Sequence, residues 1–464
     1  MAWRITVGLK DQVRDARGER VRREIGEHLG IELKSVRTID VYTVDAQLSE
    51  QEVQAAAAGP FSDPVIQEYT VNCPLAHDFD VLVEVGFRPG VTDNVGRTAR
   101  EAIQYQTGRD FSAEEGVYTS VQYLLSGGIS PEDAERIAKD FLGNGLIQRW
   151  DIVARQDFDS AKGIAVTVPK VTGTIEPAVR PIDLEVSDDA LMEISRDGML
   201  ALNLEEMQAI QAYYRDDAVI ASRKQVGLDS LPTDAELEAL AQTWSEHCKH
   251  KIFSARIDYE DEQGNKQSID SIFKSFIVQA TADVRKARGE DDICLSVFKD
   301  NAGVIKFNDD WSVVYKVETH NSPSALDPYG GALTGIVGVN RDPFGTGMGA
   351  RLMFNTDVFC FASPFYDKPL PPRLLHPRRI FEGVVEGVEH GGNKSGIPTV
   401  NGSIVFDERF AGKPLVYCGT AAIMPRTLNG QPGHEKQAQV GDRIIMTGGR
   451  IGKDGIHGAT FSSE

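Results

Sequence analysis

Cysteine is scarce in this sequence, and its few copies form no pattern. The five cysteines are widely spaced, odd in number and include no Cys-x-x-Cys pair, so they provide no disulfide framework. Such cysteine usage is typical of a reducing compartment. Long apolar runs are also missing: no stretch reaches the ~18 residues of a membrane span, and the first residues lack the apolar core of a signal peptide. We therefore expect a cytoplasmic protein without a membrane partner.

Positive charge is in short supply as well. The chain has 49 Lys and Arg against 69 Asp and Glu, which gives a net charge of -20. This surplus of negative charge argues against nucleic acid as a partner, because the protein would repel the phosphates of the nucleic acid. A smaller phosphate ligand needs cations that are placed locally. The glycine loop at 448–454 is not a P-loop, since its spacing is one residue short and Asp454 replaces the Ser or Thr that binds Mg²⁺.

The remaining composition, with 41% hydrophobic and 25% charged residues over 464 positions, is that of an ordinary globular chain of about three domains. A weak internal repeat, offset by roughly 80 residues, runs through the N-terminal third. It predicts two small βαββαβ-like units whose role is docking, and an α+β and α/β fold class overall. The expected boundaries are 1–78 and 79–155 for the two units, 156–225 for a linker, 226–430 for an α/β domain and 431–464 for a further domain that is cut short.

The densest group of chemically useful side chains follows an apolar strand that contains Lys316. Five polar residues come directly after this strand: Glu318, Thr319, His320, Asn321 and Ser322. Glu318 and Asp342 could share a Mg²⁺ ion with substrate phosphates. Between them, His320 is a candidate general base and Arg341 a cation for an anionic ligand. The alternative is a polar loop that is followed by a glycine-rich helix and binds nothing.

A second polar group ends a helix that is predicted to begin at the capping box 233–236. The spacing places Cys248 on the apolar face of this helix, and His247 and His250 on one side of its end. Zinc binding by these three residues is disfavoured, because adjacent helical positions do not converge and no fourth ligand is near. A solvated helix end and a functional pair of histidines both remain open.

Six segments together resemble the large (synthetase) subunit of phosphoribosylformylglycinamidine synthase. These segments are 244–253, 298–305, 316–325, 340–342, 396–402 and 454–463. The resemblance covers roughly residues 200–464, and the N-terminal repeat is similar, more weakly, to the small accessory subunit of the same enzyme. It implies an ATP-binding domain similar to that of aminoimidazole ribonucleotide synthetase, within a pseudo-dimer of two halves.

The resemblance also implies a reaction in purine biosynthesis by an ATP-dependent C–N ligase. ATP phosphorylates the amide oxygen of formylglycinamide ribonucleotide, and ammonia displaces phosphate from the iminophosphate to give the amidine. By position, it implies Mg²⁺ ligation by Glu318 and Asp342 and ATP contacts at Lys316 and His250, although some relatives have Tyr at the latter position. The implied ribonucleotide contacts are Thr319, His320, Asn321, Ser322 and Arg341. The implied catalytic residues are His247 and His320, with His320 as proton acceptor.

The resemblance implies partners too. The family continues well beyond the 454–463 motif, and this chain has no cysteine in a Gly-x-Cys-x-Gly elbow. We therefore expect an incomplete synthetase that needs a complementary C-terminal half and a glutaminase subunit to supply ammonia. One alternative is a non-catalytic assembly or nucleotide-binding fragment. Another is a different enzyme of the superfamily, such as aminoimidazole ribonucleotide or selenophosphate synthetase.

Overall fold

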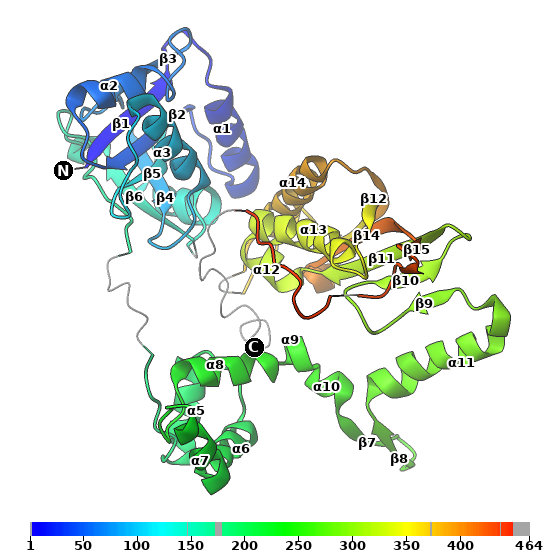
Figure 1. The fold of residues 1–464 in the computed structure, drawn as a ribbon. Coiled ribbons are helices and arrows are strands. Elements are labelled where there is room, and N and C mark those ends of the chain that lie inside the picture. The colour runs from blue at the N-terminus through cyan, green and yellow to red at the C-terminus, as the bar shows by residue number, and fades with distance from the viewer. Residues whose placement is uncertain (1, 146, 172–178, 372–373, 437, 449–464) are drawn as a thin grey trace. The chain divides into compact units, whose positions relative to one another are not determined.

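The computed structural model describes residues 2–145, 147–171, 179–371, 374–436 and 438–448 (Figure 1). The chain divides into two compact units, and each is described by itself. The first unit comprises residues 1–173 and 363–380, and the second comprises 174–362 and 381–464. The sequence motif at 454–463 lies outside the described residues. Among the residues that are described, no helix combines the length and apolar character that crossing a membrane requires.

The first unit is built from two successive strand–helix–strand–helix–strand repeats. The first repeat comprises β1 (Trp3–Leu9), α1 (Ala16–Leu29), β2 (Ser35–Asp45), α2 (Glu50–Ala58) and β3 (Gln67–Val71). The second comprises β4 (Val81–Phe87), α3 (Asn94–Thr107), β5 (Gly116–Ser126), α4 (Pro131–Arg136) with the short η1 (Ile137–Leu142), and β6 (Gln148–Ala154). All six strands form one antiparallel sheet in the order β3-β1-β2-β5-β4-β6. The repeats therefore share a sheet, joined where β2 pairs with β5.

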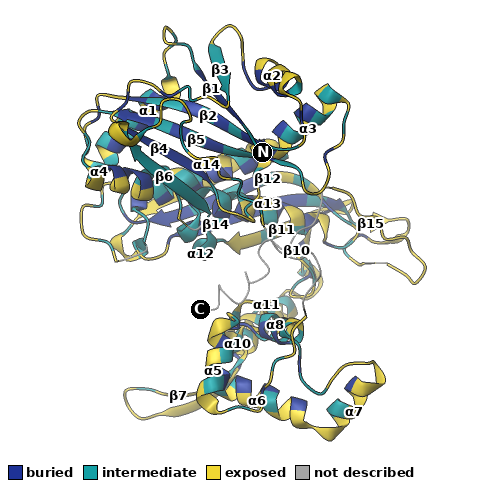
Figure 2. Ribbon diagram, turned by 90° about the vertical axis from the view of Figure 1, so that its left-hand side faces the viewer, coloured by how far each residue is buried: buried dark blue, intermediate teal, exposed yellow. Residues whose placement is uncertain are grey.

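The two repeats begin their first helices in the same way. Asp15 caps α1 by accepting a hydrogen bond from the amide of Gly18, at 2.7 Å. Asp93 caps α3 by the same bond from Gly96, also at 2.7 Å. A Cβ at either glycine would overlap a backbone oxygen of the following strand, so only glycine lets the helix approach this closely. Strands β1 and β4 are mostly buried, whereas the edge strands β3 and β6 are partly exposed along their length (Figure 2).

The second unit begins with helices that form a core of their own. The helices of this segment are α5 (Asp188–Asp197), α6 (Leu204–Arg215), α7 (Asp217–Gln225) and α8 (Asp234–Thr243), and α5, α6 and α8 supply the core. Leu191 and Met207 pack with Leu237 and Ala241, all of them fully or nearly fully buried. One core thus joins helices on both sides of residue 225, where the sequence analysis places a boundary. The predicted domain limits stay a prediction.

A set of short elements follows this helical segment. They are α9 (Glu246–Lys249), α10 (Lys251–Ser254), the hairpin strands β7 (Arg256–Glu260) and β8 (Lys266–Asp270), η3 (Phe273–Val278) and α11 (Gln279–Arg288). The hairpin is antiparallel and forms a two-stranded sheet.

The rest of the second unit is a six-stranded sheet that carries helices on one face. Its elements are β9 (Cys294–Ser296), β10 (Gly303–Lys306), β11 (Trp311–Thr319), α12 (Asn321–Leu326), α13 (Pro328–Phe344), β12 (Arg351–Phe361), α14 (Pro377–Ser395), β13 (Thr399–Phe406) and β14 (Leu415–Pro425). The strand order is β13-β12-β14-β11-β10-β9. β13 pairs parallel with β12, and the other neighbours are antiparallel. α13 contacts the three central strands β11, β12 and β14.

The opposite face of this sheet, which we name the bare face, is apolar and exposed. Five side chains on β10, β11 and β13 keep 36–46% of their surface exposed: Ile305, Trp311, Tyr315, Val317 and Val405. Cross-strand pairing places Ile305 opposite Val313. Val313 lies on the same side of β11 as Trp311, Tyr315 and Val317, because every second residue of a strand points to the same face. No described element covers these side chains enough to bury them.

Candidate functional site

The candidate site lies where β11 ends beneath α13. Alternation along β11 puts Tyr315 and Val317 on the bare face. Lys316 and Glu318 therefore point to the helix side, in line with the buried Ser312 and Val314. The last turn of α13 carries Asp342. The strand and the helix thus supply the two carboxylates that the sequence places 24 positions apart.

Three charged side chains meet at this point. The Lys316 ammonium lies 2.8 Å from Glu318 Oε1 and 2.8 Å from Asp342 Oδ2. Burial lowers the pKa of Lys316, but its hydrogen bonds to Asp342 and Glu318 outweigh this effect, so the net pKa is above its ordinary value. The lysine therefore stays charged at neutral pH, and the cluster carries one net negative charge.

This donor set fits Mg²⁺. The two carboxylates already converge on one cation, and the Glu318 side chain is 52% exposed, which leaves it accessible to a ligand. Mg²⁺ typically takes one or two carboxylates and completes its shell with water and substrate phosphates. Within the described ranges, no group of three or more His, Cys, Asp or Glu side chains could hold a metal ion on its own. The arrangement suits a metal that arrives with a phosphate ligand.

His320 lies next to the cluster with one ring nitrogen engaged. Its Nδ1 is 2.6 Å from the carbonyl oxygen of Gly331 on α13, and its backbone amide donates to Val416 on β14. A carbonyl only accepts, so Nδ1 carries the proton and Nε2 is the basic nitrogen. The ring is half-buried rather than enclosed in the apolar core. A Cβ at Gly335 would lie 3.0 Å from His320 Cβ, so this helix position keeps room for the ring.

The other residues predicted at this site are distributed around the start of α12 and the end of α13. Asn321 Oδ1 accepts a hydrogen bond from the amide of Val416 at 2.8 Å, which leaves its NH₂ group for a ligand. Thr319 and Arg341 are exposed, and Ser322 is half-buried. The structure thus gathers one end of β11, α12 and the last turn of α13, and the ligand contacts assigned to these residues stay a prediction.

His247 and His250 lie in the helical part of the second unit, and their local structure differs from the prediction. α8 ends at Thr243, and Ser245 caps a new four-residue helix, α9, by accepting from the amide of Cys248. His250 has φ 52°, a left-handed conformation that ends α9. The predicted continuous helix is therefore wrong here, and Cys248 is exposed rather than on an apolar face. The cause is the serine cap, which restarts the backbone hydrogen bonding.

Sequence reasoning missed a buried polar group beneath α13. Asn355 and Asp357 occupy alternate, inward positions of the mostly apolar strand β12, and both are almost completely buried. Polar residues at inward positions of a strand were the available signal. Asp357 also lines a cavity of about 750 Å³ between α14 and β13. Burial raises the pKa of Asp357 to about 6, and side-chain hydrogen bonds with Thr399 and Cys418 oppose this shift without cancelling it.

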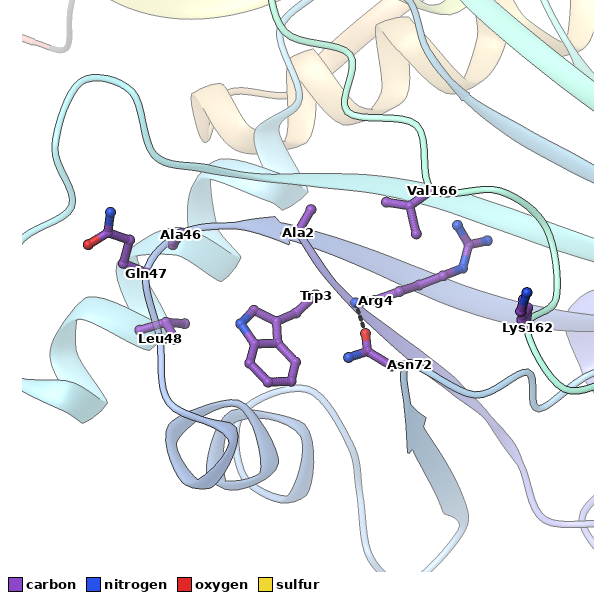
Figure 3. Close-up of a pocket in the computed structure, with 9 residues that line it drawn as sticks. All are labelled: Ala2, Trp3, Arg4, Ala46, Gln47, Leu48, Asn72, Lys162 and Val166. Carbon is purple, nitrogen blue, oxygen red and sulfur yellow. Dashed lines mark hydrogen bonds between the residues drawn. The ribbon is translucent and has the colours of Figure 1, made fainter.

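A cavity of about 540 Å³ in the first unit is lined by Trp3, Arg4, Asn72 and Lys162, among others (Figure 3). The Arg4 amide donates to Asn72 Oδ1 at 2.9 Å. The Arg4 guanidinium is paired with the buried carboxylate of Glu84. The one buried cation of this lining is thus neutralised within the sheet, which agrees with a structural role for the region.

Three family models match separate parts of the chain. The model described as AIR synthase related protein, N-terminal domain, matches residues 299–424, which include the cluster around Lys316. The formylglycinamide ribonucleotide amidotransferase linker domain matches residues 191–251. The PurS model, described as phosphoribosylformylglycinamidine (FGAM) synthase, matches residues 2–74, the first of the two repeats.

Two relatives of the chain carry the same name. Phosphoribosylformylglycinamidine synthase subunit PurL of Thermoplasma volcanium is 36% identical over 285 residues, which are 60% of this chain and 31% of that protein. The PurL subunit of Rhodococcus erythropolis is 36% identical over 240 residues, 50% of this chain and 27% of that protein. The chain spans about a third of the length of the first of these relatives.

Among solved structures, T. maritima PurL complexed with FGAR is similar at 27% sequence identity with a TM-score of 0.33, covering 53% of this chain and 31% of that one. The sequence relatives are subunits of phosphoribosylformylglycinamidine synthase, and two of the three family models carry descriptions of the same enzyme. The third model is related to AIR synthase. The chain is similar to the PurL subunit of phosphoribosylformylglycinamidine synthase, and separate parts of it match the PurS, linker and AIR-synthase-related models.

Proposed function

We propose that this chain is a component of the ATP-dependent synthetase that makes formylglycinamidine ribonucleotide in purine biosynthesis. Its substrates would be formylglycinamide ribonucleotide, ATP and ammonia. The observation that carries the proposal is the convergence of Glu318 and Asp342 on Lys316, with His320 beside them, inside the part of the chain that matches the AIR synthase model.

The charged cluster is proposed to bind the nucleotide. Glu318 and Asp342 hold Mg²⁺, and Lys316 turns from their oxygens to the phosphates of ATP. Mg²⁺, when bound, offsets the charge that develops on the transferred phosphoryl group. While Lys316 is paired with the two carboxylates, its hydrogen bonds to Asp342 and Glu318 raise the pKa of its ammonium above the ordinary value, against the lowering effect of burial.

His320 is proposed to accept the proton that ammonia loses as it attacks the phosphorylated amide. The carbonyl of Gly331 keeps the proton on Nδ1, so Nε2 is the nitrogen that can accept a proton. A positioned base of this kind contributes about 10²–10⁴-fold to a rate. Phosphate then leaves from the same carbon, and the C–N bond of the amidine is complete.

The remaining site residues are proposed to hold the ribonucleotide and the nucleotide. Thr319, Asn321 and Ser322 present hydroxyl and amide groups at the β11 exit, and the exposed Arg341 offers a guanidinium for the substrate phosphate. His247 is the second proposed catalytic residue, and His250 a proposed ATP contact. The left-handed backbone of His250 is a strained conformation of the kind that concentrates at functional sites.

Two partners are proposed, both cytoplasmic like the chain itself. A glutaminase subunit supplies ammonia. The bare face is proposed to be covered by synthetase sequence equivalent to the part of the relatives that this chain does not match, the complementary half. An exposed sheet face with Tyr315, Val317 and Val405 on it is the feature that supports this partner.

The test is ADP release from ATP in the presence of the ribonucleotide, ammonium chloride and the complementary half. His320→Asn keeps a donor for the Gly331 carbonyl and removes only the Nε2 base. We expect a loss of turnover of about 10²-fold or more with an unchanged melting temperature. His77→Asn, at an exposed position of the first unit, is the matched control and should not change the rate.

A second candidate function is a non-catalytic component that binds nucleotide or assists assembly. The observation in favour of this function is that the match covers only about a third of the length of the Thermoplasma volcanium relative. Mg·ATP binding without ADP release, even with the complementary half present, would support this second function. Turnover that survives His320→Asn would show that the base has been assigned wrongly.

A further inference from the structure

Three polar side chains from three different elements meet in the interior beneath α13. Asn340 belongs to α13, Asn355 to β12 and Thr420 to β14, and they are 4%, 0% and 0% exposed. Burying hydroxyl and amide groups is costly unless they are hydrogen-bonded. Apolar side chains would fill the same space at lower cost, so a polar group at this point calls for a reason beyond packing.

The three side chains form a closed triangle of hydrogen bonds. Thr420 Oγ1 donates to Asn340 Oδ1 at 2.7 Å. Asn355 Nδ2 donates to Asn340 Oδ1 at 2.8 Å and to Thr420 Oγ1 at 2.6 Å. Asn340 Nδ2 in turn donates to Ser395 Oγ on α14 at 2.9 Å. The triangle therefore ties α13 to two strands of the sheet and to the neighbouring helix.

This triangle adjoins the charged cluster from two directions. Thr420 stands directly opposite Lys316 in the pairing of β14 with β11, so the two side chains point to the same face. Asn340 precedes Asp342 by two residues on α13. Asp342 thus lies on a helix that the triangle anchors, and Lys316 lies on β11, the strand that pairs with β14 at Thr420.

Hydrogen bonds fix the register of a helix more sharply than apolar contacts do. A shift of α13 by one residue would move Asp342 by about 1.5 Å along the helix axis and turn it by about 100°. The carboxylate would then leave the reach of Lys316 and of any cation held by Glu318. α13 also contains Gly330, Gly331, Gly335 and Gly338, which weaken its intrinsic stability and increase its need for such anchors.

We propose that Asn340, Asn355 and Thr420 are positioning residues that hold Asp342 at the separation from Glu318 that a Mg²⁺–nucleotide ligand requires. The inference rests on the proposed function of the cluster. The triangle acts through the register of α13 and touches neither metal nor substrate. Outer hydrogen-bond partners of this kind commonly change metal affinity by about 10–100-fold when they are removed.

The test compares two substitutions at one position in the full chain. Thr420→Val keeps the shape of the side chain and removes the hydroxyl, whereas Thr420→Ser keeps the hydroxyl and removes a methyl group. The probe is Mn²⁺, titrated by electron paramagnetic resonance in the presence of ATP, and thermal unfolding is measured alongside. We expect Thr420→Val to weaken Mn²⁺ binding about 10-fold and Thr420→Ser to leave it within about twofold.

A purely structural role predicts another result. In that case both variants would unfold at a lower temperature than the wild-type chain and would bind Mn²⁺ with the same affinity as it does. This outcome overturns the inference. Ser395→Ala is the second variant in case Thr420→Val does not fold. It frees the Asn340 amide at the edge of the triangle, and we expect a weakening of Mn²⁺ binding by about threefold, smaller than at Thr420. Unchanged binding in Ser395→Ala and Thr420→Val together contradicts the proposal.

Glu318→Gln separates this inference from the proposed function. If Glu318→Gln abolishes Mn²⁺ binding while Thr420→Val does not change it, the metal site stands and the positioning role fails. If the wild-type chain with ATP binds no Mn²⁺, or Glu318→Gln binds it as the wild type does, both the metal site and the positioning role are wrong.

Discussion

Asp357 illustrates how one buried side chain can set the pH dependence of stability. No described group pairs with its Oδ1, and burial raises the pKa of the carboxyl to about 6 from an ordinary value of 3.8. Between these two values the folded chain keeps a proton that the unfolded chain has already lost. Stability therefore falls as pH rises through this window and stays lower above it.

The corresponding prediction concerns Asp357→Asn, which removes the titration. A shift of about two pKa units corresponds to roughly 2–3 kcal/mol. We expect the variant to gain about this much unfolding free energy relative to wild type between pH 4.5 and pH 8, as measured by urea denaturation. Asp309→Asn, at a carboxylate whose side chain is 97% exposed, is the control and should show no such gain. Equal pH profiles for Asp357→Asn and wild type would contradict the prediction.

The side chains of the charged cluster could be predicted from the sequence, but their partners could not. Glu318, Asp342 and Lys316 attract notice because charges follow an apolar strand. The ammonium of Lys316 bridges both carboxylates because of the way α13 packs on the sheet. This packing is a tertiary property that local sequence patterns do not contain. The bond from His320 to the Gly331 carbonyl has the same origin, since it joins two positions that local patterns treat separately.

At the scale of an element, the packing of α13 against α12 depends on the positions of the glycines in α13. A Cβ at Gly331 would overlap the carbonyl carbon of Pro323 and lie 2.5 Å from the amide of Ser324, both in α12. Gly338, on the same helix, has open space where a Cβ would be. Glycine is therefore required at the first position, and at the second it only adds flexibility to the unfolded chain.

The two glycines give a matched pair of predictions. Gly331→Ala should destabilise the second unit by about 2 kcal/mol or more, because α12 must move away from α13. Gly338→Ala should stabilise it by about 0.5–1 kcal/mol through helix propensity. Chemical denaturation followed by circular dichroism measures both. A stabilising effect at Gly331 would mean that α12 and α13 are not in contact as described.

Elements with strong periodicity were predictable, whereas their interruptions were not. Two repeats of strands and helices are present in the first unit as expected, although each has the order βαβαβ rather than the predicted βαββαβ; the apolar strand around residues 350–362 is β12. The pairing of β2 with β5 into a common sheet lies beyond local patterns, because it joins strands far apart in the chain. The restart at Ser245 was missed because a serine within a helical pattern is compatible with either a cap or a surface position.

At the scale of the whole molecule, the bare face leads to a prediction about association. A contiguous apolar face of this kind usually marks an interaction site. Val405 is 46% exposed on the edge strand β13. We expect Val405→Lys to weaken binding of the complementary half about tenfold in sedimentation experiments, because the new charge would be desolvated in the interface. The unfolding temperature should not change.

A control for this experiment lies in the first unit. Val65 is 76% exposed there, so Val65→Lys adds the same charge to another surface. It should leave association unaltered. If both variants bind the complementary half equally well, the partner does not use the bare face.

The ammonium of Lys316 has one more consequence, for the order of events at the cluster. It occupies the same carboxylate oxygens that a divalent ion would use, and thereby relieves their mutual repulsion while no ligand is present. An ion arriving alone must compete with this internal cation and leave it unsatisfied. An ion arriving with a polyphosphate gives the displaced ammonium a new anionic partner. Under the proposed function, metal and nucleotide would therefore bind interdependently at Glu318 and Asp342, because the displaced ammonium of Lys316 would need a new anionic partner.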